Sequence, residues 1–122
     1  MITEDYVSFE TAKLLKEKGF GQLTYACFAP DGEEYYGYRA VDDDIMRPTL
    51  QMAMKWLREK HRRIISPKYN EVKDERGLLY SMWFFDILPI SKTLPIIEYN
   101  QSYDTYEEAC EAAIKYCLEN LI

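Results

Sequence analysis

The sequence has little glycine or proline, few cysteines and a single histidine: 5 Gly, 5 Pro, 3 Cys and 1 His among 122 residues. The low glycine and proline content excludes a collagen-like or linker-like chain. Three cysteines do not make a disulfide scaffold and favour a reducing compartment. No run approaches the roughly 20 apolar residues that span a bilayer, and the acidic first residues lack the apolar core of a signal peptide. We therefore expect a cytoplasmic protein that does not enter a membrane.

The sequence contains enough apolar residues to form a hydrophobic core. Hydrophobic residues make up 48% and charged residues 30%, and the formal net charge is only -6. This composition is typical of a folded globular protein and not of a disordered one. At this length we expect residues 1–122 to form one α+β domain. The unusual figure is the tyrosine content, with 11 Tyr against 5 Phe and 2 Trp.

Apolar residues at helical spacing, with start and stop signals, predict three helices. Ser8 can cap the first and Gly19 can end it. Pro48 suits the first turn of the second, where its missing N–H costs nothing. Asp104 and Glu107 have the spacing of a capping box for the third. The expected helices are residues 8–18, 48–60 and 105–120.

Between these helices the pattern changes to that of strands. Residues 22–29 and 33–40 are separated by Pro30-Asp31-Gly32, which predicts a hairpin turn. The apolar run 78–87 predicts a central strand covered on both faces. The remaining expected elements are strands at 62–69 and 94–99, with Pro67 at a strand end or edge, and a charged loop at 70–77. The fold class is thus α+β, with an antiparallel sheet of four to five strands packed with three helices in the order αββαββ(β)α.

Three segments carry a resemblance to a known family. They are FETAKLLKEKGF (9–20), PTLQMAMKWLRE (48–59) and YEEACEAAIKYCLENL (106–121). These segments resemble a family of small uncharacterised proteins of Bacteroides-type gut bacteria and their phages or mobile elements. The plan of a Pro-Thr helix, a hairpin and a closing helix is also similar to small phage domains built as helix–sheet–helix sandwiches. The resemblance implies a bacterial, intracellular setting and brings no catalytic residue, cofactor or activity.

The tyrosines of the second hairpin strand are the first candidate site. Tyr36 and Tyr38 alternate with Tyr35, so one face of this strand can present rings to solvent. Tyrosine gives a large contact area at low entropic cost and is favoured at interfaces. The alternative is that most of these rings are buried, with the hydroxyl at the rim. The leading hypothesis is a non-enzymatic module for binding a protein partner or for self-association.

A basic stretch is the second candidate site. It consists of Lys55, Arg58, Lys60, Arg62 and Arg63. Beside Trp56 and Tyr69 it could contact phosphates and stack on bases, which makes a nucleic-acid accessory protein the alternative function. The same residues could bind an acidic protein surface. The acidic pI of about 4.8 opposes binding to nucleic acid. Basic residues at the C-terminus of a helix also have a structural role, because they complement the helix dipole.

Other side chains that could bind a metal or take part in catalysis form weaker patterns. Asp42-Asp43-Asp44 could hold Mg²⁺ or Ca²⁺, but it lacks the ligand spacing of a calcium loop and fits a solvated turn better. His61 has no serine or cysteine at a catalytic spacing. Cys27, Cys110 and Cys117 are expected to be small core residues. We therefore expect no catalytic residue, no metal site and no cofactor.

Overall fold

The computed structural model describes residues 2–39, 41–90 and 96–122, and it confirms an α+β fold with three helices. The elements in chain order are α1 (Phe9–Glu17), β1 (Ala26–Phe28), β2 (Glu34–Tyr36), β3 (Ile45–Arg47), α2 (Leu50–Lys60), β4 (Arg63–Lys73), β5 (Leu79–Pro89), β6 (Ile97–Tyr103) and α3 (Tyr106–Asn120). No helix within the described ranges is both long and apolar enough to cross a membrane.

The strands form two sheets, which corrects the expectation of one sheet with four to five strands. Both sheets are antiparallel and three-stranded, in the orders β2-β1-β3 and β4-β5-β6. Strand β3 was not expected, because Asp42-Asp43-Asp44 predicted a break before the second helix. Instead these residues turn the chain back, and Ile45 pairs with Phe28 on the second edge of β1. A strand of three residues is too short to show a periodicity in the sequence.

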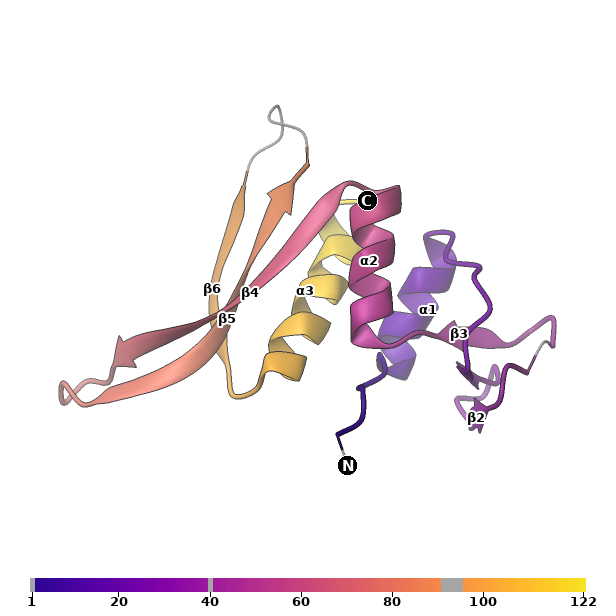
Figure 1. Ribbon diagram of the computed structural model, residues 1–122, viewed down its shortest axis with the longest axis horizontal. Coiled ribbons are helices and arrows are strands. Elements are labelled where there is room, and N and C mark those ends of the chain that lie inside the picture. Colours follow the sequence, from indigo (N-terminus) through magenta and orange to yellow (C-terminus); the bar gives the residue numbers. More distant parts are fainter. Residues whose placement is uncertain (1, 40, 91–95) are drawn as a thin grey trace.

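The three helices lie between the two sheets (Figure 1). This is the reverse of a helix–sheet–helix plan, in which the sheet is the middle layer. Helices α1 and α3 run in the same direction, because Thr11 bonds to Glu111 while Lys18, further along α1, bonds to Ile122. Helix α2 begins beside the same ends, where Leu50 N donates to Asp5 O at 2.9 Å. All three N-termini therefore lie at one end of the molecule (Figure 1).

Helix α3 contributes most to the core, as its apolar stripe predicts. Its fully buried residues are Ala109, Cys110, Ala113, Ile114, Cys117 and Leu118. All of these except Ala109 pack with Leu15 of α1, Leu57 of α2 and Phe85 of β5 in one apolar cluster. The three cysteines are buried and unbridged, which confirms their assignment as core residues.

The helix caps are confirmed in one case and corrected in two. Ser8 caps α1, its side chain accepting from Thr11 N at 3.2 Å. Helix α2 is capped by Thr49, so Pro48 precedes the cap and does not stand in the first turn. Helix α3 is capped by Thr105 and not by Asp104, with Glu108 N donating to Thr105 Oγ1 at 3.1 Å. In both corrected cases the cap is the threonine directly before the first helical residue.

Strands β4 and β5 form a longer hairpin than expected. Residues 70–73, which were expected in a loop, are paired in β4. The turn is tight because Asp74 Oδ1 accepts from Arg76 N at 2.8 Å and Leu78 N at 2.9 Å, and Gly77 takes a positive φ of 82°. Strand β4 is an outer strand, which confirms an edge position for Pro67.

Strand β5 is central in its sheet, as predicted. However, the helices cover only one of its faces, and not both as expected. Phe85 and Ile87 are buried against the helices, whereas Tyr80, on the opposite face, is exposed. Helices lie on one side of this sheet only (Figure 1). The predicted strand at 94–99 corresponds to β6, and residues 94 and 95 lie outside the described ranges.

The packing of α3 leads to a stability prediction. Ala113 is fully buried, whereas Ala112, on the same helix, is only partly buried and lines an open cavity. Enlarging a side chain in a filled core forces neighbours apart, so Ala113→Leu is expected to lower the free energy of unfolding by about 1–3 kcal/mol. Ala112→Leu is the matched control and should cost much less. Urea unfolding of both variants measures the difference, and equal losses would contradict the packing described.

Candidate interaction surface

Four tyrosines from three separate segments come together at the end of the first sheet, and we call them the tyrosine surface. Tyr25, Tyr36 and Tyr38 are 48%, 52% and 59% exposed, and Tyr6 is partly buried beside them. The ring centroids of Tyr6 and Tyr36 are 6.0 Å apart, those of Tyr36 and Tyr25 6.1 Å, and those of Tyr25 and Tyr38 5.3 Å. The rings thus form a continuous row, in which the Tyr6–Tyr36 and Tyr25–Tyr38 pairs pack edge to face and the Tyr25–Tyr36 pair is tilted.

The backbone after β2 places the outer rings of this row. Gly37 and Tyr38 both have a positive φ, of 107° and 61°. This bend lets Gly37 N and Tyr38 N both donate to Tyr25 O, at 2.8 and 3.1 Å. A positive φ is unfavourable for a bulky residue, so the two hydrogen bonds offset a local strain. Their effect is to hold the Tyr38 ring against the Tyr25 ring.

Arg47 of β3 organises the inner part of the tyrosine surface. Its Nε donates to Val7 O at 2.8 Å, and its Nη1 lies 3.3 Å from Glu34 Oε1 and 3.4 Å from the Tyr36 hydroxyl. The guanidinium carbon also lies 5.5 Å from the centroid of the Tyr6 ring. A planar group with several donors can hold the N-terminal segment, β2 and the rings in one geometry.

A cavity of about 270 Å³ opens beside the tyrosine surface. Its lining is Glu4, Tyr6, Leu23, Thr24, Tyr25, Tyr38, Arg47, Pro48, Thr49 and Met52. Aromatic and aliphatic groups line most of it, with one carboxylate and one guanidinium among the charged groups. It can take a small apolar group while the surrounding tyrosine hydroxyls contact polar atoms.

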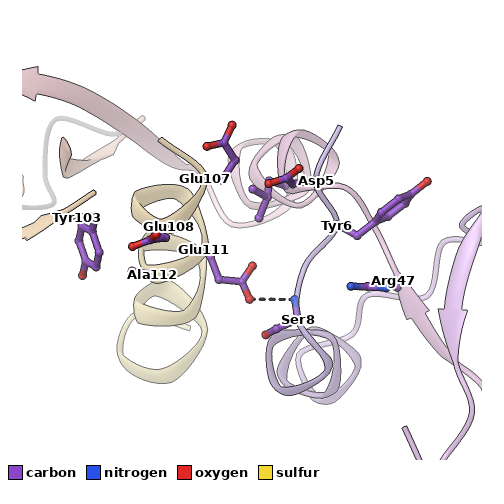
Figure 2. Close-up of a pocket in the computed structure, with 10 residues that line it drawn as sticks. Asp5, Tyr6, Ser8, Arg47, Tyr103, Glu107, Glu108, Glu111 and Ala112 are labelled. Carbon is purple, nitrogen blue, oxygen red and sulfur yellow. Dashed lines mark hydrogen bonds between the residues drawn. The ribbon is translucent and has the colours of Figure 1, made fainter. Parts of the chain in front are cut away.

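A second cavity, of about 530 Å³, lies on the other side of Tyr6 and Arg47 (Figure 2). Four carboxylates line it, those of Asp5, Glu107, Glu108 and Glu111. Glu111 Oε1 accepts from Ser8 N at 3.0 Å and from Thr11 Oγ1 at 2.6 Å. These carboxylates stand at the N-terminal ends of the helices, where negative charge is stabilised by the helix dipoles. Their arrangement is explained by the fold.

Tyr35 does not belong to the tyrosine surface, although the sequence grouped it with Tyr36 and Tyr38. It faces the opposite side of β2, and the Arg39 guanidinium carbon lies 3.8 Å from its ring centroid. Arg39 Nε in turn lies 2.8 Å from Asp44 Oδ2 in an ion pair. Asp44 is 5% exposed and accepts from Cys27 Sγ at 3.5 Å. The expectation of a solvated turn at Asp42–Asp44 is therefore wrong for Asp44, because Arg39 compensates its buried charge.

The predicted basic residues lie at the C-terminal end of α2 and at the start of β4. Lys55, Arg58, Lys60 and Arg62 are exposed and Arg63 is partly exposed. None of the five forms an ion pair with a carboxylate in the part of the chain that the structure describes. Trp56 packs between Phe20 and His61. Tyr69 is six residues along β4 from Arg63, a separation of about 20 Å at the rise of a strand.

The other reactive groups lie in environments that suppress their reactivity. Burial raises the pKa of Cys110 to about 11 and of Cys117 to about 12. Burial, together with the hydrogen bond to Asp44, also raises the pKa of Cys27. The three thiols are therefore protonated near neutral pH and are poor nucleophiles. Among the described residues, no three His, Cys, Asp or Glu side chains could hold a metal ion.

Sequence reasoning missed Tyr6 and Arg47 as parts of the site. Tyr6 lies in an irregular segment before α1 and reaches the site through a bridge to Thr49, which is distant in the chain. Arg47 belongs to the unexpected strand β3. No local pattern marks either residue.

Comparison with protein-family models, curated proteins and solved structures finds no match to this chain.

The buried ion pair leads to a prediction for the first sheet. Asp44→Asn removes the charge opposite Arg39, and we expect it to lower the midpoint of urea unfolding. Asp43→Asn, an exposed neighbour in the same turn, is the matched control and should leave the midpoint nearly unchanged. Identical midpoints for the two variants would show that the Arg39–Asp44 pair does not stabilise the fold.

His61 gives a prediction for the pH dependence of stability. Burial, and secondarily the charge of Lys18, lowers the pKa of His61 from its ordinary value of 6.5. The unfolded chain therefore binds this proton first as the pH falls, and the free energy of unfolding should decrease below pH 6.5. ¹H NMR titration of this single histidine should give a midpoint below 6.5. His61→Gln should remove the change in stability between about pH 7.5 and 5.5, because ordinary carboxyl groups titrate lower.

Proposed function

We propose that the protein is a non-enzymatic, cytoplasmic interaction module whose tyrosine surface binds an extended, proline-rich segment of a protein partner. The observation that carries the proposal is the continuous row formed by Tyr6, Tyr36, Tyr25 and Tyr38. Three of these rings are about half exposed although large aromatic side chains are favourable to bury. Exposed aromatic groups gathered in one place are typical of interfaces.

The geometry of the row favours an extended peptide. Edge-to-face packing at centroid spacings of 5.3 and 6.0 Å sets neighbouring rings at an angle to one another, so the row is not flat. Proline-rich segments form a stiff polyproline II helix and dock into grooves lined by aromatic residues. The cavity beside Tyr25 and Tyr38 offers space for one proline ring. A preformed helix of this kind loses little conformational entropy on binding.

The polar groups around the tyrosine surface also favour a proline-rich partner. The hydroxyls of Tyr25 and Tyr38 make no hydrogen bond with any residue in the described ranges, so both can donate to the carbonyl oxygens of a bound peptide. Glu4 lines the cavity and Glu34 lies beside Arg47. Glu34 is paired with Arg47, and the carboxylate of Glu4 at the cavity favours a basic residue next to the prolines.

The proposal is tested with an arginine-flanked decaproline peptide and the ¹⁵N-labelled protein. We expect chemical-shift changes centred on Tyr25, Tyr36 and Tyr38, with a Kd between about 1 μM and 1 mM, that is about -8 to -4 kcal/mol. Tyr38→Ala should weaken binding about 5- to 30-fold, the loss of about 1–2 kcal/mol expected for an anchoring aromatic residue.

Tyr80→Ala provides the control for this titration. Tyr80 is 47% exposed, close to the value for Tyr25, but lies in β5 of the other sheet. It should bind the peptide as the wild type does. Absence of shifts at millimolar peptide, or equal weakening by the two substitutions, would refute binding at the tyrosine surface.

A nucleic-acid accessory role is the second candidate, supported by the exposed basic residues that lack carboxylate partners. It predicts that binding of a fluorescent oligonucleotide weakens steeply with salt and is lost when Arg58, Lys60 and Arg62 are replaced by Ala. This role would use aromatic side chains that stack on bases beside the basic residues. Tyr69 is too far from these residues to do so, and Trp56 is packed between Phe20 and His61. Fluorescence anisotropy at low salt measures it, and absence of binding eliminates this candidate.

A further inference from the structure

The cavity beside the tyrosine surface is lined by two groups of residues that differ in charge. Leu23, Tyr25 and Tyr38 line it from the part of the chain around β1 and β2, and none of them is charged. Glu4 and Tyr6 line it from the N-terminal segment. Glu4 is the one carboxylate in the lining. A segment bound at the tyrosine surface therefore meets negative charge where it passes the N-terminal segment.

The backbone next to Glu4 is held in place. Leu50 N donates to Asp5 O at 2.9 Å. Tyr6 forms an antiparallel bridge to Thr49. The N-terminal segment is thus paired with the start of α2 as far as its fifth residue. This pairing keeps Glu4 beside the cavity, although its own side chain is exposed.

The two charged residues of the cavity differ in what they can offer a ligand. Glu4 makes no ion pair or side-chain hydrogen bond with any residue in the described ranges. Arg47 already donates to Val7 O and pairs with Glu34, and its side chain is only 15% exposed. The cavity can therefore attract a cation through Glu4, whereas its guanidinium is not free to bind an anion.

We propose that Glu4 is the specificity-determining residue of the tyrosine surface. It selects a segment with a basic residue beside its prolines and rejects a segment with an acidic residue there. This inference rests on the proposed function, in which Tyr25 and Tyr38 bind the prolines. A basic side chain beside Glu4 is attracted to it, whereas a carboxylate is repelled and finds no free cation in the cavity. Specificity arises from both effects, the attraction and the repulsion.

The dimensions of a polyproline II helix allow both contacts at once. This helix rises about 3.1 Å per residue and has three residues per turn. With one proline ring in the cavity, the residue three positions along lies on the same side of the helix, about 9 Å away. Glu4 lines the same cavity as Tyr25 and Tyr38. A long basic side chain within one turn of the bound proline can therefore approach Glu4.

Three decaproline peptides test the proposal, one flanked by arginine, one by glutamate and one with neutral, capped ends. The wild type should bind the arginine-flanked peptide about 3- to 10-fold more tightly than the glutamate-flanked one, because an exposed attraction is exchanged for a repulsion. The Kd of the neutral peptide should lie between these values. Raising the NaCl concentration to about 1 M should bring the three Kd values together, since salt screens exposed charges.

A charge reversal separates the role of Glu4 from a general effect on structure. Glu4→Lys should invert the order of the two charged peptides, which a loss of structure could not do. Glu75→Lys is the matched control, because Glu75 is exposed in the turn between β4 and β5, away from the first sheet (Figure 1). It makes the same change in net charge and should keep the wild-type order.

The outcomes distinguish this proposal from the proposed function. Equal Kd values for the two charged peptides, with chemical-shift changes at Tyr25 and Tyr38, would overturn the role of Glu4 and leave the proposed function in place. The wild-type order retained in Glu4→Lys, or inverted in Glu75→Lys, would overturn it as well. Absence of binding by all three peptides would overturn the proposed function itself, and this inference with it.

Discussion

The close packing of helix α3 against its neighbours is the contact on which the rest of the structure depends. Its buried face is made largely of small side chains, Ala109, Cys110, Ala113 and Cys117. Small residues let the backbones of α1, α2 and the second sheet approach the helix from different sides. The larger Ile114 and Leu118 fill the spaces between them. The second sheet packs directly on α3, and the first sheet is attached through α1, which contacts both α3 and β3.

This packing also explains how charge is distributed over the molecule. With three helices pointing the same way, their positive dipole ends lie together, and carboxylates gather there (Figure 2). Their negative ends lie together as well, and Lys16, Arg58 and Lys60 stand in the last turns of α1 and α2. The acidic cavity and the basic stretch are thus two results of one arrangement. Neither needs a ligand to explain it, whereas the exposed tyrosines have no such explanation within the fold.

Sequence patterns predicted the features that repeat along the chain and missed those that depend on contacts between distant residues. The helices could be placed because each buries a periodic apolar stripe, as Ala109 and Ala113 illustrate. The exposure of Tyr36 agrees with the alternation of its strand, whereas Tyr38 lies beyond β2 and is placed by the bend at Gly37. Strand β3 was missed because three residues show no period, and with it Arg47. The burial of Asp44 depends on Arg39, and the place of Tyr6 depends on Thr49, so no local pattern could indicate either.

The position of Pro67 in the outer strand β4 has a consequence for assembly. An outer strand with a complete row of N–H and C=O groups can add another strand, and chains joined in that manner grow into fibres. Proline has no N–H and interrupts this row at its middle, and the charges of Lys68 and Lys73 discourage edge-to-edge pairing further. Strand addition at the β4 edge is thereby disfavoured. The chain can thus present the outer strand of a long hairpin without offering a complete row of donors and acceptors along it.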